Sequence, residues 1–366
     1  MKIPIGKPDI GKDEIEAVER TMKSGWVTQG KKVEDFEESF ADYCGAKYGI
    51  ATTSGTTALH TALASIGIHN GDEVITTPLS CVSTANPILY LHAKPIFIGL
   101  EPATLNIDPS TLEKKITERT KAILPVHMFG HPVDMDPIME MAEKQGIYVV
   151  EDAAHALGAI YKGKKVGALG HIACFSFYGD KMITTAEGGI ALTNNKELAE
   201  RMRMLRNHGM DEHRRFYHPI LGYNYKMSDI HAAIGIAQMR KLDKYVQQRR
   251  RNVEYLNKQL NDLKIQLPTE KSYAFNVYYV YHLITKGRRQ KEKAVENLEN
   301  GGIETRPLLS FIPTQPPYEH LACNPTDYPV AKKANENGFF ISNSPQLSQS
   351  ELNYMASTLR KALTEP

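Results

Sequence analysis

The chain has 366 residues, of which 42% are hydrophobic and 23% are charged. This length exceeds what one hydrophobic core usually fills, so we expect one large domain and one smaller domain. The composition excludes a fibrous or disordered chain, and the net charge of +2 argues against a nucleic-acid or membrane-surface protein.

Targeting signals and cysteine motifs are both missing from the sequence. The N-terminal MKIPIGKPDIGKDEIEAV has no apolar signal-peptide core, and no later segment reaches the roughly 18 uncharged apolar residues of a membrane span. We therefore expect a cytoplasmic protein with no membrane partner. The four cysteines, Cys44, Cys81, Cys174 and Cys323, have no C-x-x-C spacing, which predicts reduced thiols and no zinc site.

From residue 45 to 195, short β-branched runs alternate with segments of helical periodicity. The runs EVITT, PIFIGL, KAILPVH, IYVVE, ACFSF and GIALT predict buried strands. Helix-length segments such as 134–145 separate most of them. A helix beginning near Thr56 places an apolar stripe on one side, formed by Ala58, Leu59, Ala62, Leu63 and Ile66. The pattern predicts an α/β fold with a mostly parallel mixed sheet that is covered on both faces.

The rest of the chain predicts a second, smaller unit. Residues 228–260 show one long helical pattern, and a helix of this kind often joins a large domain to a smaller one. The run YYVYHLI, a helical stretch at 292–299 and Pro-rich loops then predict a compact α+β unit. We place the boundary near residue 245, with a large α/β domain at 1–245 and a small α+β domain at 246–366.

The segment VEDAAHALGAIYKGKKVGALGHIACFSFYGDKMITTAEGGIALT carries the most chemistry. Asp152 follows an apolar strand, and Lys181 lies in a polar loop between two further strands. Strand ends of an α/β sheet converge on one crevice, where ligands bind. Singly, such an acid is more often a helix cap and such a lysine a solvated side chain. Together with the close backbone approach allowed by Gly188 and Gly189, they favour a functional site.

This combination suits pyridoxal 5′-phosphate (PLP) chemistry, which needs a lysine amine, an anion against the pyridinium nitrogen and a phosphate cradle. Asp152 can supply the anion, and Lys181 can supply the amine and later move a proton as general base and acid. In TTSGTTALH, Ser54, Gly55 and Thr56 lie where a helix begins, so free N–H groups and the helix dipole favour a phosphate there. An ordinary N-cap explains that turn equally well.

Several segments together resemble the sugar-nucleotide aminotransferases of the aspartate-aminotransferase fold. They are the block at 151–193 with its FSF…K-x-I-T-T-x-E-G-G pattern, the turn at Ser54, the segment LRNHGMDEHRRFYHPILGYNYKMSDIHAAIGIAQM, and GIETRPLL. The resemblance runs from WVTQGKKVEDFE to SNSPQL, which is nearly the whole chain. It implies a PLP-dependent aminotransferase whose cofactor is held by the large domain.

The resemblance also implies roles for individual residues. Lys181 matches the family's Schiff-base lysine, Asp152 the partner of the pyridine nitrogen, and His155 the contact to the ring oxygen. Gly55, Thr56 and Ser176 match phosphate contacts. A dehydrating relative carries histidine in place of the lysine, so the presence of Lys181 favours transamination.

Further positions concern the partner subunit and the substrate. Asn224, in GYNYKM, matches a residue that reaches the phosphate from the other subunit, which implies a homodimer with shared active sites. Cys81 stands where the family usually places an aromatic side chain over the cofactor ring, and a thiol is a weaker stacking partner. A nucleotide diphosphate should attract cations, and the candidate substrate contacts are Arg306, Lys226 and Tyr318.

The resulting hypothesis is transfer of an amino group from L-glutamate to a nucleotide-linked 4-keto-6-deoxy sugar, in two half-reactions at one site. Such amino sugars enter polysaccharides such as O-antigens. Two alternatives stay open: the same chemistry on a UDP- or dTDP-linked sugar, a 3-keto sugar or a keto-cyclitol, and a non-catalytic sensor with the PLP fold.

Two further patterns predict ordinary structural residues rather than a metal site or a nucleic-acid contact. In HMFGH, His127 and His131 have a zinc-compatible spacing only on a helix, which Pro125, Gly130 and Pro132 oppose. We predict polar residues in a loop near the crevice and no metal. The basic runs GRRQKEK and QQRRRN predict solvated helix faces rather than contacts with nucleic acid.

Overall fold

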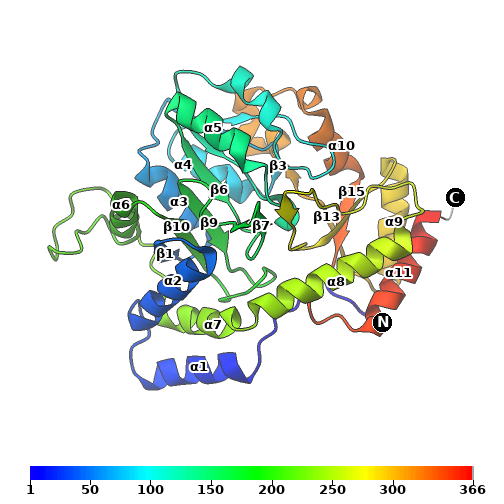
Figure 1. Cartoon of the computed structure of the whole chain (residues 1–366), viewed down its shortest axis with the longest axis horizontal. Coiled ribbons are helices and arrows are strands. Elements are labelled where there is room, and N and C mark those ends of the chain that lie inside the picture. The colour runs from blue at the N-terminus through cyan, green and yellow to red at the C-terminus, as the bar shows by residue number, and fades with distance from the viewer. Residues whose placement is uncertain (365–366) are drawn as a thin grey trace.

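A computed structural model describes residues 1–364 and is built around one seven-stranded sheet of order β1-β10-β9-β6-β5-β2-β4 (Figure 1). Its strands are β1 (Tyr48–Thr52), β2 (Glu73–Thr76), β4 (Lys94–Phe97), β5 (Thr120–Leu124), β6 (Tyr148–Asp152), β9 (Ile172–Ser176) and β10 (Gly189–Thr193). Only β10 runs antiparallel to its neighbours. The predicted mostly parallel mixed sheet is confirmed, and each predicted run forms a strand. The edge strand β1 is an addition.

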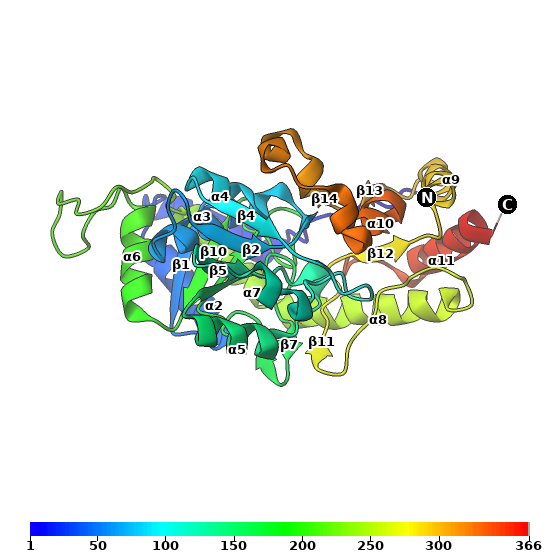
Figure 2. The ribbon, with the colours of Figure 1, turned by 90° about the horizontal axis from the view of Figure 1, so that it is seen from above.

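Helices cover both faces of this sheet (Figures 1 and 2). One face packs against α3 (Gly55–Ser65), α4 (Asn86–Tyr90) and α6 (Lys196–Arg206), and the other against α2 (Lys31–Cys44), α5 (Met135–Gln145) and α7 (Asp229–Met239). The outermost helix, α1 (Lys12–Lys23), packs on α7. Strand residues alternate between the two cores, as Val149 and Val150 do, because successive side chains point to opposite faces.

Of the two helices predicted in detail, one prediction is confirmed and the other is wrong. The helix near Thr56 is confirmed as α3, with the predicted stripe facing the core. The single long helix over 228–260 is wrong, because α7 ends at Met239 and α8 (Leu242–Leu260) starts anew. The Lys241 N–H donates to Gln238 O, three residues back instead of four, and Lys241 Nζ forms an ion pair with Glu14 of α1 at 2.8 Å.

A second sheet of order β12-β15-β13 forms the C-terminal part. Its strands are β12 (Tyr281–Ile284), β13 (Thr305–Pro307) and β15 (Gly338–Ile341), and its helices are α9 (Arg288–Asn300), α10 (Pro329–Asn337) and α11 (Gln349–Thr364). The strands β12 and β15 and the helices α8, α9 and α11 enclose a core of their own, whereas the buried residues of α10 belong to a core of the large sheet. Ile3 belongs to the core of the C-terminal part and bridges to Ile303, so the N-terminal segment lies at the same end of the molecule as α11 (Figure 1). The boundary near residue 245 falls inside α8 and remains a proposal.

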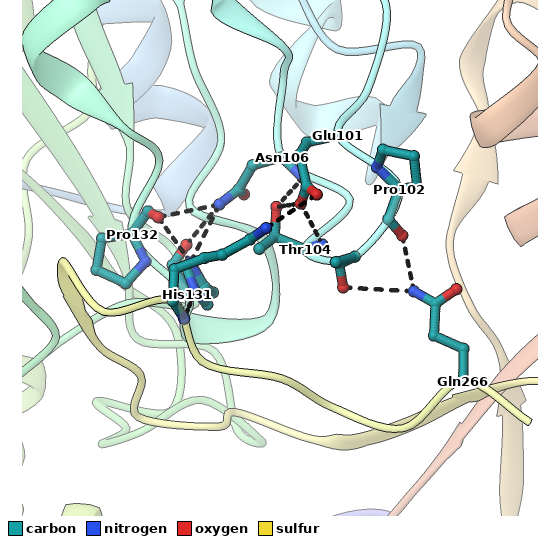
Figure 3. A network of polar contacts seen from close by, with 9 residues as sticks. Glu101, Pro102, Thr104, Asn106, His131, Pro132 and Gln266 are labelled. Atoms are coloured by element: carbon teal, nitrogen blue, oxygen red, sulfur yellow. Dashed lines mark hydrogen bonds and ion pairs between the residues drawn. The ribbon is translucent and has the colours of Figure 1, made fainter.

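Short strands and a polar network join the two parts. Strand β14 (Ser310–Phe311) pairs with β3 (Leu79–Ser80), and β11 (Ala274–Phe275) pairs with β7 (Ile160–Tyr161), which pairs with β8 (Lys164–Lys165). Figure 3 shows the polar contacts of the chain between α8 and β11. Gln266 Nε2 donates to Pro102 O at 2.8 Å, and the Lys271 N–H donates to His131 Nε2 at 3.1 Å. Lys271 Nζ lies 3.2 Å from Glu101 Oε1.

The prediction that QQRRRN forms a solvated face is wrong for its first arginine. Arg249 is buried, and its Nη1 donates to Tyr279 O at 2.7 Å and to Asn343 O at 2.8 Å. The cause is the position of α8 against the C-terminal part, where buried carbonyl groups need donors. Arg288, from GRRQKEK, is exposed at the start of α9 as predicted.

Two other expectations concern cysteines and membranes. All four cysteines are free thiols, as predicted. Between residues 1 and 364 no helix combines the length and the apolar character needed to cross a membrane.

Candidate active site

Asp152 is the last residue of β6 and lies buried where the parallel strands end. Thr84 Oγ1 donates to its Oδ2 at 2.7 Å, and the Ala154 N–H donates to its Oδ1 at 3.2 Å. Burial raises the pKa of this carboxyl, while the two hydrogen bonds and the charge of Lys181 lower it in part. The carboxylate is therefore held in one orientation in a place with little water.

Lys181 lies in the loop between β9 and β10 and is partly buried. Burial lowers the pKa of its amine, and the charges of Asp180 and Asp152 oppose that shift. His155 is buried nearby, and burial together with the Lys181 charge holds its pKa well below the ordinary range. Its ring is therefore neutral, and Nδ1 has no hydrogen-bond partner among the described residues. The predicted residues Asp152, His155 and Lys181 are thus neighbours.

The turn before α3 lies against the end of β9. The Ser54 side chain caps α3, and the N–H groups of Gly55 and Thr56 have no partner within residues 1–364. A Cβ on Gly55 would lie 2.7 Å from Ser176 Cβ, and a Cβ on Gly189 would lie 2.2 Å from Ser54 O. Glycine is therefore required at both positions for the turn to approach the sheet this closely. The close approach brings unpaired N–H groups and the Ser176 hydroxyl together at a helix N-terminus.

These groups fit PLP. Free N–H groups at a helix N-terminus suit a phosphate, and a buried carboxylate suits a pyridinium nitrogen. The unpartnered Nδ1 of His155 marks a polar position that the chain itself leaves unsatisfied. An amine with a lowered pKa is a better nucleophile toward an aldehyde at neutral pH.

Asn224 and Lys226 lie beside the chain that leads into the turn. Lys226 bridges to Thr52, and Tyr225 O accepts the Thr53 N–H at 3.0 Å. Lys226 Nζ donates to Asn224 Oδ1 at 2.6 Å, and Asn224 is exposed. The loop between α6 and this segment extends away from the body, at the left of Figures 1 and 2. Both residues are therefore close to the turn, and Asn224 is exposed while Lys226 is half-buried.

Arg306 and Cys81 lie on the approach to Lys181. Arg306 Nη2 pairs with Glu304 Oε1 at 2.5 Å and lines a cavity of about 490 Å³ that Asp180 also lines. Cys81 is exposed.

Tyr318 is placed differently from the other predicted substrate contacts. It is fully buried, and its hydroxyl donates to Asn86 Oδ1 at 2.5 Å. Any contact of Tyr318, Arg306 or Lys226 with substrate remains a prediction.

The two histidines of HMFGH are buried polar residues near the crevice, as predicted. His127 Nδ1 accepts the Val133 N–H at 3.0 Å, so Nε2 carries the proton and donates to Glu151 Oε2 at 2.9 Å. The His127 N–H also donates to Asp152 O at 3.1 Å. Across residues 1–364 no cluster of three or more His, Cys, Asp or Glu side chains could hold a metal ion.

Sequence reasoning missed three residues of the site. Thr84 holds Asp152 from the short 3-10 helix Val82–Thr84, and Tyr279 contacts both Lys181 and His155. Asp180 accepts a hydrogen bond from the Tyr279 hydroxyl at 2.9 Å. For Asp180, its position next to Lys181 in the sequence could have indicated a role. Thr84 and Tyr279 reach the site only through tertiary contacts, which the sequence does not reveal.

Comparisons with known proteins support this description. The family model for DegT/DnrJ/EryC1/StrS aminotransferases matches residues 8–360. A GDP-perosamine synthase from Caulobacter vibrioides is 39% identical, with 99% of this chain and 98% of that protein covered. A GDP-perosamine synthase from Escherichia coli O157:H7 is 36% identical, with 98% of each covered. A sugar aminotransferase structure from Streptococcus pneumoniae, in a PLP form, gives a TM-score of 0.95 at 27% identity, with 99% of each chain covered.

The fold is that of the PLP-dependent aminotransferases, and the matches extend over nearly the whole chain. Within that class, the chain belongs to the DegT/DnrJ/EryC1/StrS aminotransferase family.

Replacing Ser176 by alanine should weaken PLP binding about tenfold to a hundredfold, because one hydrogen bond to a charged phosphate is lost. The hydroxyl has no partner within the described chain, so the thermal stability of the apoenzyme should not change. Fluorescence titration of apoenzyme with PLP measures the affinity, and Ser357→Ala, exposed on α11, is the control. Unchanged affinity would show that Ser176 does not touch the phosphate.

The Asp152→Asn variant should unfold at higher temperature than the native apoenzyme at pH 8. The pKa of Asp152 is raised in the folded chain, so the folded chain holds this proton more tightly than the unfolded chain does. The free energy of unfolding therefore falls as the pH rises from the ordinary carboxyl pKa through the raised pKa. Asparagine removes that loss, and the difference should close toward acid pH. Calorimetry of apoenzyme measures this, with Asp136→Asn as control, since a lowered pKa at that exposed site predicts no gain. Equal or lower stability of Asp152→Asn at pH 8 would contradict the account.

Proposed function

We propose that this enzyme transfers an amino group from L-glutamate to the keto carbon of a GDP-linked 4-keto-6-deoxy sugar. The observation that carries the proposal is the near full-length similarity to proteins named GDP-perosamine synthase, together with a lysine at position 181. The product would be an amino sugar for polysaccharide synthesis, and a cytoplasmic location remains a prediction.

Lys181, Asp152 and His155 would divide the chemistry between them. When bound, PLP supplies an aldehyde for amines and a ring that withdraws electrons from the substrate's α-carbon. Lys181 would hold the cofactor and, once displaced by the amino donor, carry the α-proton, for which its lowered pKa suits it. Asp152 would keep the ring nitrogen protonated. The neutral His155 would place a hydrogen-bonding nitrogen at the ring oxygen without adding a charge that repels Lys181.

The phosphate of the cofactor would be held by Ser54, Gly55, Thr56 and Ser176. In a homodimer, Asn224 would reach the phosphate site of the partner subunit. Its exposure and the outward course of the preceding loop support that role. Each site would then be complete only in the dimer.

The sugar nucleotide would enter past Cys81 and the cavity that Arg306 lines. Arg306 is already paired with Glu304, so it offers a diphosphate a positioned donor with a partly neutralised charge. Lys226 would supply a further cation, and Tyr318 would shape the floor of the site through its buried ring. The small Cys81 side chain would leave more room over the cofactor than an aromatic ring does.

An absorption experiment tests the first half-reaction. Purified enzyme loaded with PLP should be yellow, and L-glutamate should convert the visible band to the near-ultraviolet band of the pyridoxamine form. The Lys181→Ala variant should lack the native visible band. Among GDP-, UDP- and dTDP-linked keto sugars and a keto-cyclitol, the GDP-linked 4-keto-6-deoxy sugar should restore the yellow form fastest. PLP binding without any response to glutamate would refute the proposed donor, and no turnover with any substrate would favour the sensor alternative.

A further inference from the structure

Tyr279 is a buried aromatic residue beside Lys181 and His155. The Lys181 Nζ atom lies 4.7 Å from the centre of its ring. The same ring stacks on His155, with ring centres 4.5 Å apart and planes inclined by 11°. One side chain therefore contacts the amine and the imidazole that are proposed to act on the cofactor.

Tyr279 is held rigidly from several sides. Its hydroxyl donates to Asp180 Oδ1 at 2.9 Å, and its pKa is far above the ordinary range because of burial and that carboxylate, so the hydroxyl stays protonated. Its N–H donates to Phe129 O at 2.8 Å, and its carbonyl accepts from Arg249 Nη1 at 2.7 Å. The ring position is thus fixed by the segment after β5, by the Lys181 loop and by α8.

We infer that Tyr279 is a positioning residue for Lys181, whose ring holds the amine in the crevice as a cation and whose hydroxyl fixes Asp180 beside it. The inference rests on the proposed role of Lys181. It explains how Lys181, which has no ion pair with any residue from 1 to 364, is kept in one place before the cofactor arrives. A cation over an aromatic face is attracted by the ring quadrupole, and the attraction grows as water is excluded.

The charge state of Lys181 reflects all the groups that face it. Asp180 lies on its own loop, Asp152 at the end of β6, Cys81 before the short helix at Val82–Thr84, and His155 in the loop after β6. The carboxylates favour the cation, and burial opposes it. The Tyr279 ring adds attraction for the cationic form only. Removing the aromatic face should therefore lower the pKa of Lys181.

The experiment measures the pKa of Lys181 in the apoenzyme, from the pH dependence of its acetylation by limiting acetic anhydride, quantified on the Lys181 peptide by mass spectrometry. Tyr279→Leu should lower that pKa by about half a unit to one unit. Tyr279→Phe keeps the ring and should retain most of the native value. Tyr278→Leu is the matched control, since the adjacent Tyr278 ring contacts Arg250 and not Lys181 or His155, and it should leave the pKa unchanged.

A second comparison covers the case in which Tyr279→Leu does not fold. Phenylalanine and a trifluorinated phenylalanine at position 279 have nearly the same shape, but fluorination weakens the attraction for cations. The fluorinated form should show the lower Lys181 pKa. Equal pKa values in these two variants would overturn the inference, as would a shift of the same size in Tyr278→Leu. The readout uses apoenzyme and no amino donor, so the failure of glutamate to react would leave this result standing.

Discussion

The Asp152 carboxylate and the Lys181 amine share one crevice from which most water is excluded, and they do not form an ion pair with each other. Burial disfavours both charges, which raises the pKa of the acid and lowers that of the amine. The chain offsets this cost in part through Thr84 and Ala154 at the acid, and through Asp180 at the amine. A ligand that carries a ring nitrogen, a phosphate and an aldehyde would offset the remaining cost of burying the two charges. The site is therefore better satisfied with PLP than without it.

The rest of the fold serves this arrangement. Gly55 and Gly189 let the turn before α3 lie directly against the end of β9, which brings a helix N-terminus to the crevice. Beneath the turn, Glu37 of α2 accepts the Ala51 N–H at 2.7 Å and a hydrogen bond from the buried Arg206, so the edge strand that leads into the turn is anchored. On the other side, Arg249 ties Tyr279 to the C-terminal part. The site thus depends on contacts between segments that are distant in sequence.

Features with local causes in the sequence could be predicted, and features that depend on tertiary contacts could not. The strands, α3 and the Lys181 loop were predictable because hydrophobic runs, a Ser-Gly-Thr turn and paired glycines leave local marks. The break between α7 and α8 was not, because it depends on a hydrogen bond and on the ion pair of Lys241 with Glu14 of α1. Arg249 was misread as solvated for a similar reason, since a basic run does not reveal which carbonyl groups it will meet. Tyr279 was hidden within YYVYHLI, where its aromatic character indicates only a strand.

The measurement that tests the central claim most directly is the transfer of label from ¹⁵N-glutamate to a GDP-linked 4-keto-6-deoxy sugar, followed by mass spectrometry of the nucleotide sugar. The account predicts one ¹⁵N atom per product molecule, formation of unlabelled 2-oxoglutarate in equal amount, and no product with Lys181→Ala. A nucleotide sugar that stays free of ¹⁵N although the enzyme is loaded with PLP would contradict the account.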